Sequence, residues 1–302
     1  MLRKGACIRR SAGQDKNQEA NFKYLSCMII DAHTHIGEIS FPVGRSRISS
    51  MPEHTLLDAI EKYSIDFILV SSIEGAEFNS DRELMPADRQ IPQLVSMQRV
   101  VDFVMKNRQR AKALLWVKPY SEERSSELDE FIRTNREFIA GLKIHPKLSN
   151  MEFRDKRMMP FIGMAGEYNL PVLVHTEDDG RSNVGFVEEV AKKYREINFI
   201  MAHMGMGSDN REAIGIIKRN PNIYGDIALA ESGNVVRAIN ECGSDKIIFG
   251  SDAPVFGIDT YKNYLPVIDS IKSNFSGEEV DNVLYKNSMS LFRLNDIHGE
   301  TV

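Results

Sequence analysis

The chain has 302 residues, of which 42% are hydrophobic and 27% are charged, and its formal net charge is −5 at pH 7. This composition is typical of a globular protein and argues against nucleic-acid partners, while no run approaches the roughly 18 apolar residues of a membrane span. The three cysteines are scattered and odd in number, which indicates reduced thiols in a cytoplasmic protein and not a disulfide framework.

Residues 1–27 differ from the rest of the chain. They hold six lysines and arginines against two acidic residues, a net charge of +4, and they lack the apolar stretch of a signal peptide. We predict that residues 1–27 are a disordered basic extension, or the product of an upstream start codon, and that residues 28–302 form the folded domain. A transit peptide is a weaker alternative because two acids interrupt the segment.

From Met28 onward, short apolar runs rich in β-branched residues alternate with amphipathic stretches. Because the runs are apolar almost throughout, we expect parallel strands buried on both faces. The predicted strands are 28–31, 66–72, 112–118, 139–145, 171–175, 197–203, 222–229 and 246–252. The predicted helices are 52–64, 92–110, 127–138, 161–169, 184–196, 210–220 and 234–243, with a closing helix over 278–294.

Eight strand–helix units in about 270 residues predict an α/β fold, a single-domain (β/α)8 TIM barrel. An open doubly wound sheet is the runner-up, but no glycine-rich phosphate loop follows the first strand. Residues 36–52 and 73–90 are longer than a bare barrel needs. Both would lie at the carboxyl ends of the strands, where barrels keep their active sites.

Polar side chains gather at the carboxyl ends of these strands. Five of the seven histidines fall there, and Asp252 ends the last strand in "FGSDAP". In a barrel these ends meet on one rim, so we expect the side chains to lie close together. The five are His33, His35, His145, His175 and His203, whereas His54 and His298 are expected on the surface.

The pair "HTH" is by itself a weak signal, but the joint pattern favours a metal site. Side chains at i and i+2 of a strand point the same way, so His33 and His35 can share one divalent ion. His175 and Asp252, from other strands, would complete a set of nitrogen and oxygen ligands. With no cysteine in this set, we expect one Zn ion, with Mn, Fe or Co as alternatives. His145, which precedes a proline, is expected to contact a metal-ligating side chain or the substrate.

The motifs "DAHTH", "GLKIHP", "PVLVHTE", "MAHMG" and "FGSDAP", in this order, resemble the amidohydrolase superfamily. Within it they are similar to a branch of metal-dependent hydrolases that includes enzymes like aminocarboxymuconate-semialdehyde decarboxylase. The resemblance covers residues 28–294 and implies a (β/α)8 barrel with His33, His35, His175 and Asp252 as metal ligands.

The resemblance also assigns roles to two further residues. His203 matches a histidine that binds a second metal in binuclear members and contacts the reactive water or substrate in mononuclear ones. Lys143 lies where some members carry a carboxylated lysine that bridges two ions. We expect an unmodified Lys143 paired with a nearby acid, and therefore a single ion.

The leading functional hypothesis is a hydrolase that uses a metal-activated water on an amide, lactone or ester bond of a small molecule. Asp252 would move the proton and His203 would stabilise the oxyanion as a donor. Lys143 and His145 are expected to bind a polar group of the substrate. Arg45, Arg47 and Arg181 on the rim loops are candidates to bind a substrate carboxylate, with a solvated surface arginine as the favoured alternative for each one alone.

Two other functions use the same residues. A metal-dependent decarboxylase of a carboxylated small molecule would need the same ligands, together with a proton donor and an apolar wall. A barrel that binds a ligand without catalysis is the less favoured third reading. A monomer and a homo-oligomer are equally compatible with the sequence.

Overall fold

A computed structural model describes residues 28–39, 50–79 and 81–294. The predictions for residues 1–27, Arg45, Arg47 and His298 lie outside the described residues. None of the described helices is long and apolar enough to cross a membrane.

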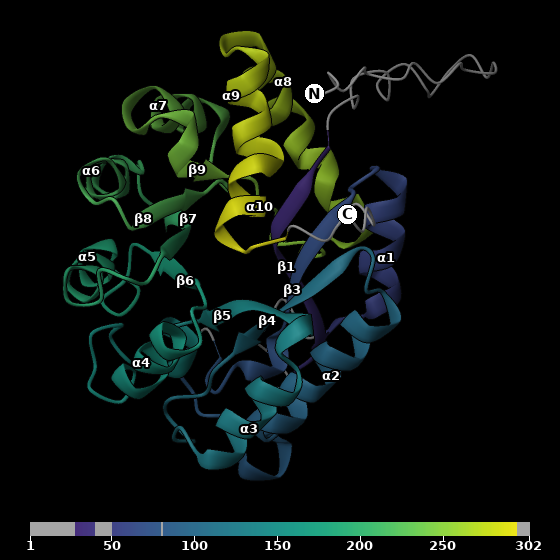
Figure 1. Cartoon of the computed structure of the whole chain (residues 1–302), viewed down its shortest axis with the longest axis vertical. Coiled ribbons are helices and arrows are strands. Elements are labelled where there is room, and N and C mark those ends of the chain that lie inside the picture. Colours follow the sequence, from purple (N-terminus) through teal and green to yellow (C-terminus); the bar gives the residue numbers. More distant parts are fainter. Residues whose placement is uncertain (1–27, 40–49, 80, 295–302) are drawn as a thin grey trace, which may run out of the picture.

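In the described part of the chain, nine strands form one curled sheet in the order β2-β1-β3-β4-β5-β6-β7-β8-β9 (Figure 1). All neighbouring strands run parallel except β2, which pairs antiparallel with β1. The short β2 was not predicted. The strands are β1 (Ile30–Glu38), β2 (Ser50–Met51), β3 (Phe67–Ser72), β4 (Ala111–Trp116), β5 (Ile139–Ile144), β6 (Val172–Glu177), β7 (Phe199–Met206), β8 (Ile223–Asp226) and β9 (Ile247–Ile248).

Each parallel strand is followed by a helix on the outside of the sheet (Figure 1). These helices are α1 (Glu53–Lys62), α2 (Gln93–Lys106), α3 (Ser126–Thr134), α4 (Met159–Glu167), α5 (Val184–Lys193), α6 (Arg211–Arg219), α7 (Ser232–Cys242) and α8 (Leu265–Asn274). The strand–helix alternation predicted from the sequence is therefore present throughout the described residues.

The end of the chain differs from the prediction in two ways. Helix α8 was missed, because its buried residues Val267, Ile268 and Ile271 extend over little more than one turn and give a weak periodic signal. The predicted closing helix over 278–294 consists of three short pieces. They are α9 (Gly277–Asp281), a π-helical turn (Asn282–Lys286) and α10 (Asn287–Leu291).

The last predicted strand, 246–252, is regular only over Ile247–Ile248. Beyond it the chain still runs beside β1. The Asp252 N–H donates to the His33 carbonyl at 2.8 Å, the His35 N–H donates to the Ala253 carbonyl at 2.7 Å, and Thr34 forms a parallel bridge with Ala253. The two ends of the curled sheet are thereby brought together, which places Asp252 beside the histidines of β1.

The strands are buried on both faces, as their apolar sequences predicted. In β3, Ile68 and Val70 pack in the layer between the sheet and the helices, whereas Phe67 and Leu69 pack inside the curl. This alternation follows from the two-residue repeat of a strand. Burying each such side chain stabilises the fold by about 1.5–3 kcal/mol, so the sheet is a rigid frame for the residues at its ends.

Candidate metal centre

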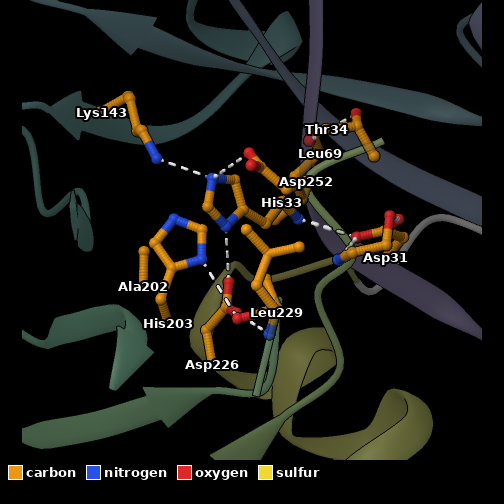
Figure 2. A network of polar contacts seen from close by, with 12 residues as sticks. Asp31, His33, Thr34, Leu69, Lys143, Ala202, His203, Asp226, Leu229 and Asp252 are labelled. Atoms are coloured by element: carbon orange, nitrogen blue, oxygen red, sulfur yellow. Dashed lines mark hydrogen bonds and ion pairs between the residues drawn. The ribbon is translucent and has the colours of Figure 1, made fainter. Parts of the chain in front are cut away.

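His33 and His35 point from β1 into the curl of the sheet, where they meet side chains from the opposite strands. The ring centroid of His33 lies 5.0 Å from that of His35 and 5.0 Å from that of His203 on β7. Thr34 faces the other way and donates to the Leu69 carbonyl at 2.9 Å. Figure 2 shows His33 between Lys143, Asp252 and Asp226, with His203 beside it. The structure therefore brings together residues predicted from four different strands.

Asp252 contacts both histidines of β1. Its Oδ1 atom lies 2.9 Å from Nε2 of His35 and 3.3 Å from Nε2 of His33. Burial acts to raise the pKa of Asp252, but the electrostatic interaction with His33 and the hydrogen bond from His35 outweigh it and hold the pKa well below its usual range. The carboxylate is therefore ionised at neutral pH.

The Nδ1 atoms of three imidazoles are held by oxygen atoms from other segments of the chain. Carboxylate and carbonyl oxygens only accept, so in two of these contacts Nδ1 carries the hydrogen and Nε2 presents its lone pair to the cluster. Such anchoring of the distal nitrogen is typical of metal-binding histidines. The contacts join Nδ1 of His33 to Asp226 Oδ2 (2.8 Å), Nδ1 of His203 to the Ala228 carbonyl (3.1 Å), and Nδ1 of His35 to Ser71 Oγ (2.9 Å).

These donor atoms fit a divalent metal ion. One ligand atom from each of His33, His203 and Asp252 lies within 4.8 Å of the others. Two atoms bound to one ion at about 2.1 Å are themselves about 3.0–3.4 Å apart at common coordination angles. The Asp252–imidazole distances of 2.9 and 3.3 Å are close to that spacing. A nitrogen and oxygen set suits Zn, Mn, Fe or Co.

Burial also keeps the imidazoles in the form that a metal needs. It is the largest cause that lowers the pKa of His33 and His145 well below the usual value, lowers that of His35 and His175, and lowers that of His203 to about 4. Neutral imidazole is the metal-binding form, so protons do not compete for these nitrogens near neutral pH.

His175 lies at the edge of the cluster. Its ring is 5.0 Å from His203, but its Nε2 atom faces Glu177 Oε2 at 3.1 Å. Burial acts to raise the pKa of Glu177, but hydrogen bonds from His175 and Lys147 lower it to about 2. Because this nitrogen is engaged by a carboxylate, the assignment of His175 as a ligand stays a prediction.

Lys143 on β5 and His145 just beyond its end both face inward, as side chains two residues apart along a strand do. Nζ of Lys143 lies 2.7 Å from Nε2 of His33, so its hydrogen-bond partner is an imidazole and not the acid that was expected. The ring of His145 stacks on His175 at 3.7 Å and on Trp116 at 5.3 Å. The strand-4 residue Trp116 was not singled out from the sequence.

The remaining predicted residues lie elsewhere. Arg181 is half-buried in the loop after β6, where its backbone N–H donates to Asp179 and its carbonyl accepts from Phe153. Its hydrogen bonds among the described residues do not reach the imidazole cluster. His54 is exposed on α1, which confirms its assignment to the surface.

Two further acidic residues support the cluster. Asp31 connects β1 to the segment that carries Asp252. It accepts from the backbone N–H of His33 at 3.0 Å and of Ser251 at 3.1 Å, and from the Tyr261 hydroxyl at 2.8 Å. Asp226 was missed because it lies inside the predicted strand 222–229, whereas in the structure the strand ends at this residue. Its role depends on a partner far away in the sequence.

The backbone at two of the cluster residues is strained. His203 has φ of 66° and Asp252 has φ of 61°, both in the left-handed region that costs a non-glycine residue about 1–3 kcal/mol. The turn after His203 is held by Asn210, whose side-chain N–H groups donate to the carbonyls of His203 and Met204 at 3.2 and 2.8 Å. Strain that the surroundings enforce is typical of functional sites.

A family model described as amidohydrolase matches residues 30–294. The chain belongs to the amidohydrolase family. This confirms the resemblance found in the motifs. No curated protein sequence matches the chain significantly.

Solved structures share the amidohydrolase fold at low sequence identity. The first is a probable 2-pyrone-4,6-dicarboxylic acid hydrolase from Acinetobacter baumannii (13% identity, TM-score 0.60, covering 88% of this chain and 99% of that one). The second is 5-carboxyvanillate decarboxylase from Sphingomonas paucimobilis (13%, 0.63, 88% and 99%). The third is dihydroxybenzoic acid decarboxylase from Polaromonas sp. JS666 with bound manganese and 2-nitroresorcinol (15%, 0.63, 89% and 98%). The likeness establishes the fold, a curled α/β sheet of the TIM-barrel kind.

Proposed function

We propose that this amidohydrolase is a metal-dependent hydrolase of a small molecule, built on a complete (β/α)8 barrel. His33, His35 and Asp252 would hold one divalent ion, Zn or Mn, and His175 would complete the set by exchanging its contact with Glu177 for the ion. The observation that carries this proposal is the ionised Asp252 carboxylate 2.9 and 3.3 Å from two imidazole nitrogens. Nε2 of His33 carries a lone pair that faces this carboxylate, and facing lone pairs at 3.3 Å need a proton or a cation between them.

When bound, the ion would polarise a substrate carbonyl and lower the pKa of a water to about 7. Asp252 is ionised and partly accessible, with 17% of its side chain exposed, so it can accept a proton from that water and pass it to the leaving group. This role needs an acceptor oxygen within hydrogen-bond reach of the reacting atoms.

His203 acts as an acceptor in this proposal and not as the oxyanion donor expected from the sequence. Its Nδ1 hydrogen is used by the Ala228 carbonyl, and its low pKa leaves Nε2 without a proton. We therefore assign His203 to orient the water through Nε2. The donor to the developing oxyanion, or to a substrate carboxylate, is then Lys143, whose amine carries hydrogens at this end of the sheet.

Decarboxylation of an aromatic carboxylate is the second candidate. The parallel stack of Trp116, His145 and His175 offers a flat surface beside the cluster, with interplanar angles of 13° and 14°. In this reaction the bond between ring carbon and carboxylate breaks, CO2 leaves, and the carbon takes a proton from a group such as Lys143.

Isotope-labelled assays distinguish the two reactions. Protein loaded with Zn2+ or Mn2+ is incubated in H2(18)O with small lactones, amides and esters and, separately, with hydroxybenzoates. Hydrolysis puts one 18O atom into the product carboxylate, which is the expected result. CO2 release from a hydroxybenzoate, with no turnover of the other substrates, would replace hydrolysis by decarboxylation. Protein that binds no metal after loading contradicts both.

A further inference from the structure

The carboxylate of Asp226 sits at the end of β8 with no exposed surface and uses its two oxygens for different tasks. Oδ2 lies 2.8 Å from Nδ1 of His33, and Oδ1 accepts from the Ala228 N–H at 2.5 Å. Figure 2 shows Asp226 on the side of His33 opposite Lys143. Because a carboxylate accepts and does not donate, the hydrogen of His33 stands on Nδ1 and the lone pair on Nε2.

The contact between Asp226 and His33 lies directly beside the backbone of Gly250. A Cβ atom added to Gly250 would lie 2.4 Å from Asp226 Oδ2 and 2.9 Å from His33 Cβ. Both distances are too short for real Cβ contacts, and both neighbours are held in the buried interior. The glycine is needed for space, so the chain makes room for this one contact between β8 and β1.

The second oxygen of Asp226 reaches another imidazole through the backbone. Ala228, whose N–H it binds, presents its carbonyl to Nδ1 of His203 at 3.1 Å. Asp226 therefore holds the turn that orients His203 as well as the ring of His33. One buried carboxylate sets the direction of two inward-facing nitrogens.

We propose that Asp226 is a positioning residue that selects the tautomer of His33 and fixes the turn behind His203. The absence of a side chain at Gly250 leaves the space that the contact between Asp226 and His33 requires. The inference rests on the proposed metal site. Groups that orient metal-binding histidines typically contribute about 10–100-fold to metal affinity. We expect the same here for Asp226, although it is not itself a ligand.

Two variants and one spectrum test the proposal on the full chain. Affinity for Mn2+ is measured by competition with a chromophoric chelator. Asp226→Asn and Gly250→Ala should each lower it about 10–100-fold, while the exposed Asp58→Asn and Gly233→Ala leave it unchanged. Gly233 is a matched control because a Cβ there meets nothing within 4 Å. Wild-type affinity in both test variants would overturn the proposal.

The tautomer is observed directly in the metal-free protein. A 15N-histidine spectrum, assigned with His33→Gln, should show His33 with its hydrogen on Nδ1, and Asp226→Asn should move it to Nε2 in part or in full. A wild-type His33 with the hydrogen on Nε2 would refute the inference, even if Asp226→Asn fails to fold. If the wild-type protein binds no metal, the proposed function fails, but the spectrum still decides the role of Asp226.

Discussion

Nζ of Lys143 lies 2.7 Å from Nε2 of His33, and both side chains are buried inside the curled sheet. Since the Nδ1 hydrogen of His33 is bound by Asp226, Lys143 donates to the lone pair at Nε2. That lone pair is the one a metal ion would use. The Lys143 ammonium therefore competes with a metal ion for Nε2 of His33.

This competition predicts a pH dependence of metal binding. Burial lowers the pKa of Lys143 to about 8, although Asp252 and Asp226 oppose the shift. Below that pH the ammonium repels the ion, and above it the neutral amine does not. Mn2+ affinity should therefore rise by up to about tenfold per pH unit as pH increases toward 8, and level off above it. Chelator competition between pH 6.5 and 9.5 measures this.

The matched comparison is Lys143→Met against Lys156→Met, which changes an exposed lysine. The pH dependence should disappear in the first and persist in the second. The cluster histidines do not titrate in this range, because their pKa values lie below the usual one. An unchanged slope in Lys143→Met would show that another group controls the binding.

Removing the imidazoles of β1 should remove the metal. The double variant His33→Ala and His35→Ala is expected to contain no stoichiometric ion by plasma emission spectroscopy, because Asp252 and His175 alone cannot hold it. The exposed His54→Ala serves as the control and should keep the ion. Retained metal in the double variant would exclude this site.

Single variants decide between His175 and His203 as the further ligand. The proposal expects His175→Ala to lose the metal, and His203→Ala to keep it but lose turnover. The opposite outcome would assign the ion to His33, His203 and Asp252, the group whose ligand atoms lie within 4.8 Å of one another. Metal content and kcat are measured on the same samples.

Asp252→Asn should affect catalysis far more than folding. The amide keeps an oxygen that can accept from His35 but cannot take up a proton, so we expect kcat to fall about 10²–10⁴-fold. The thermal midpoint of the metal-free protein should change by only a few degrees. Asp58→Asn on α1 controls for a lost surface charge, and near wild-type turnover of Asp252→Asn would remove the residue from proton transfer.

The fluorescence of Trp116, the sole tryptophan, reports on the packing around the candidate site. An ideal Cβ at Gly75 would lie 2.3 Å from Trp116 Cγ, so Gly75→Ala should displace the indole and destabilise the protein by about 1–3 kcal/mol. Urea unfolding followed by Trp116 fluorescence measures both effects. Gly163→Ala on α4, where a Cβ meets nothing within 4 Å, should be neutral or stabilising by up to about 1 kcal/mol. Equal stability of the two variants would contradict the crowding at Trp116.

The alternation of strands and helices was predictable because buried parallel strands are almost continuously apolar and helices repeat every 3.6 residues. The pattern failed where packing overrides periodicity. Residues 246–252 look like one strand, but regular pairing stops at Ile248 and the chain turns through the strained Asp252. Helix α8 shows too short an apolar face to be distinguished from a loop.

The sequence by itself determined which strand ends carry the imidazoles and the carboxylate, because spacing along a strand decides which side chains share a face. Only the tertiary structure decided which nitrogen of each imidazole faces inward. The reason is that the orienting groups come from elsewhere in the chain: Asp226 is 193 residues from His33, and Ser71 is 36 from His35. Such contacts form only when the sheet curls, so no local pattern encodes them.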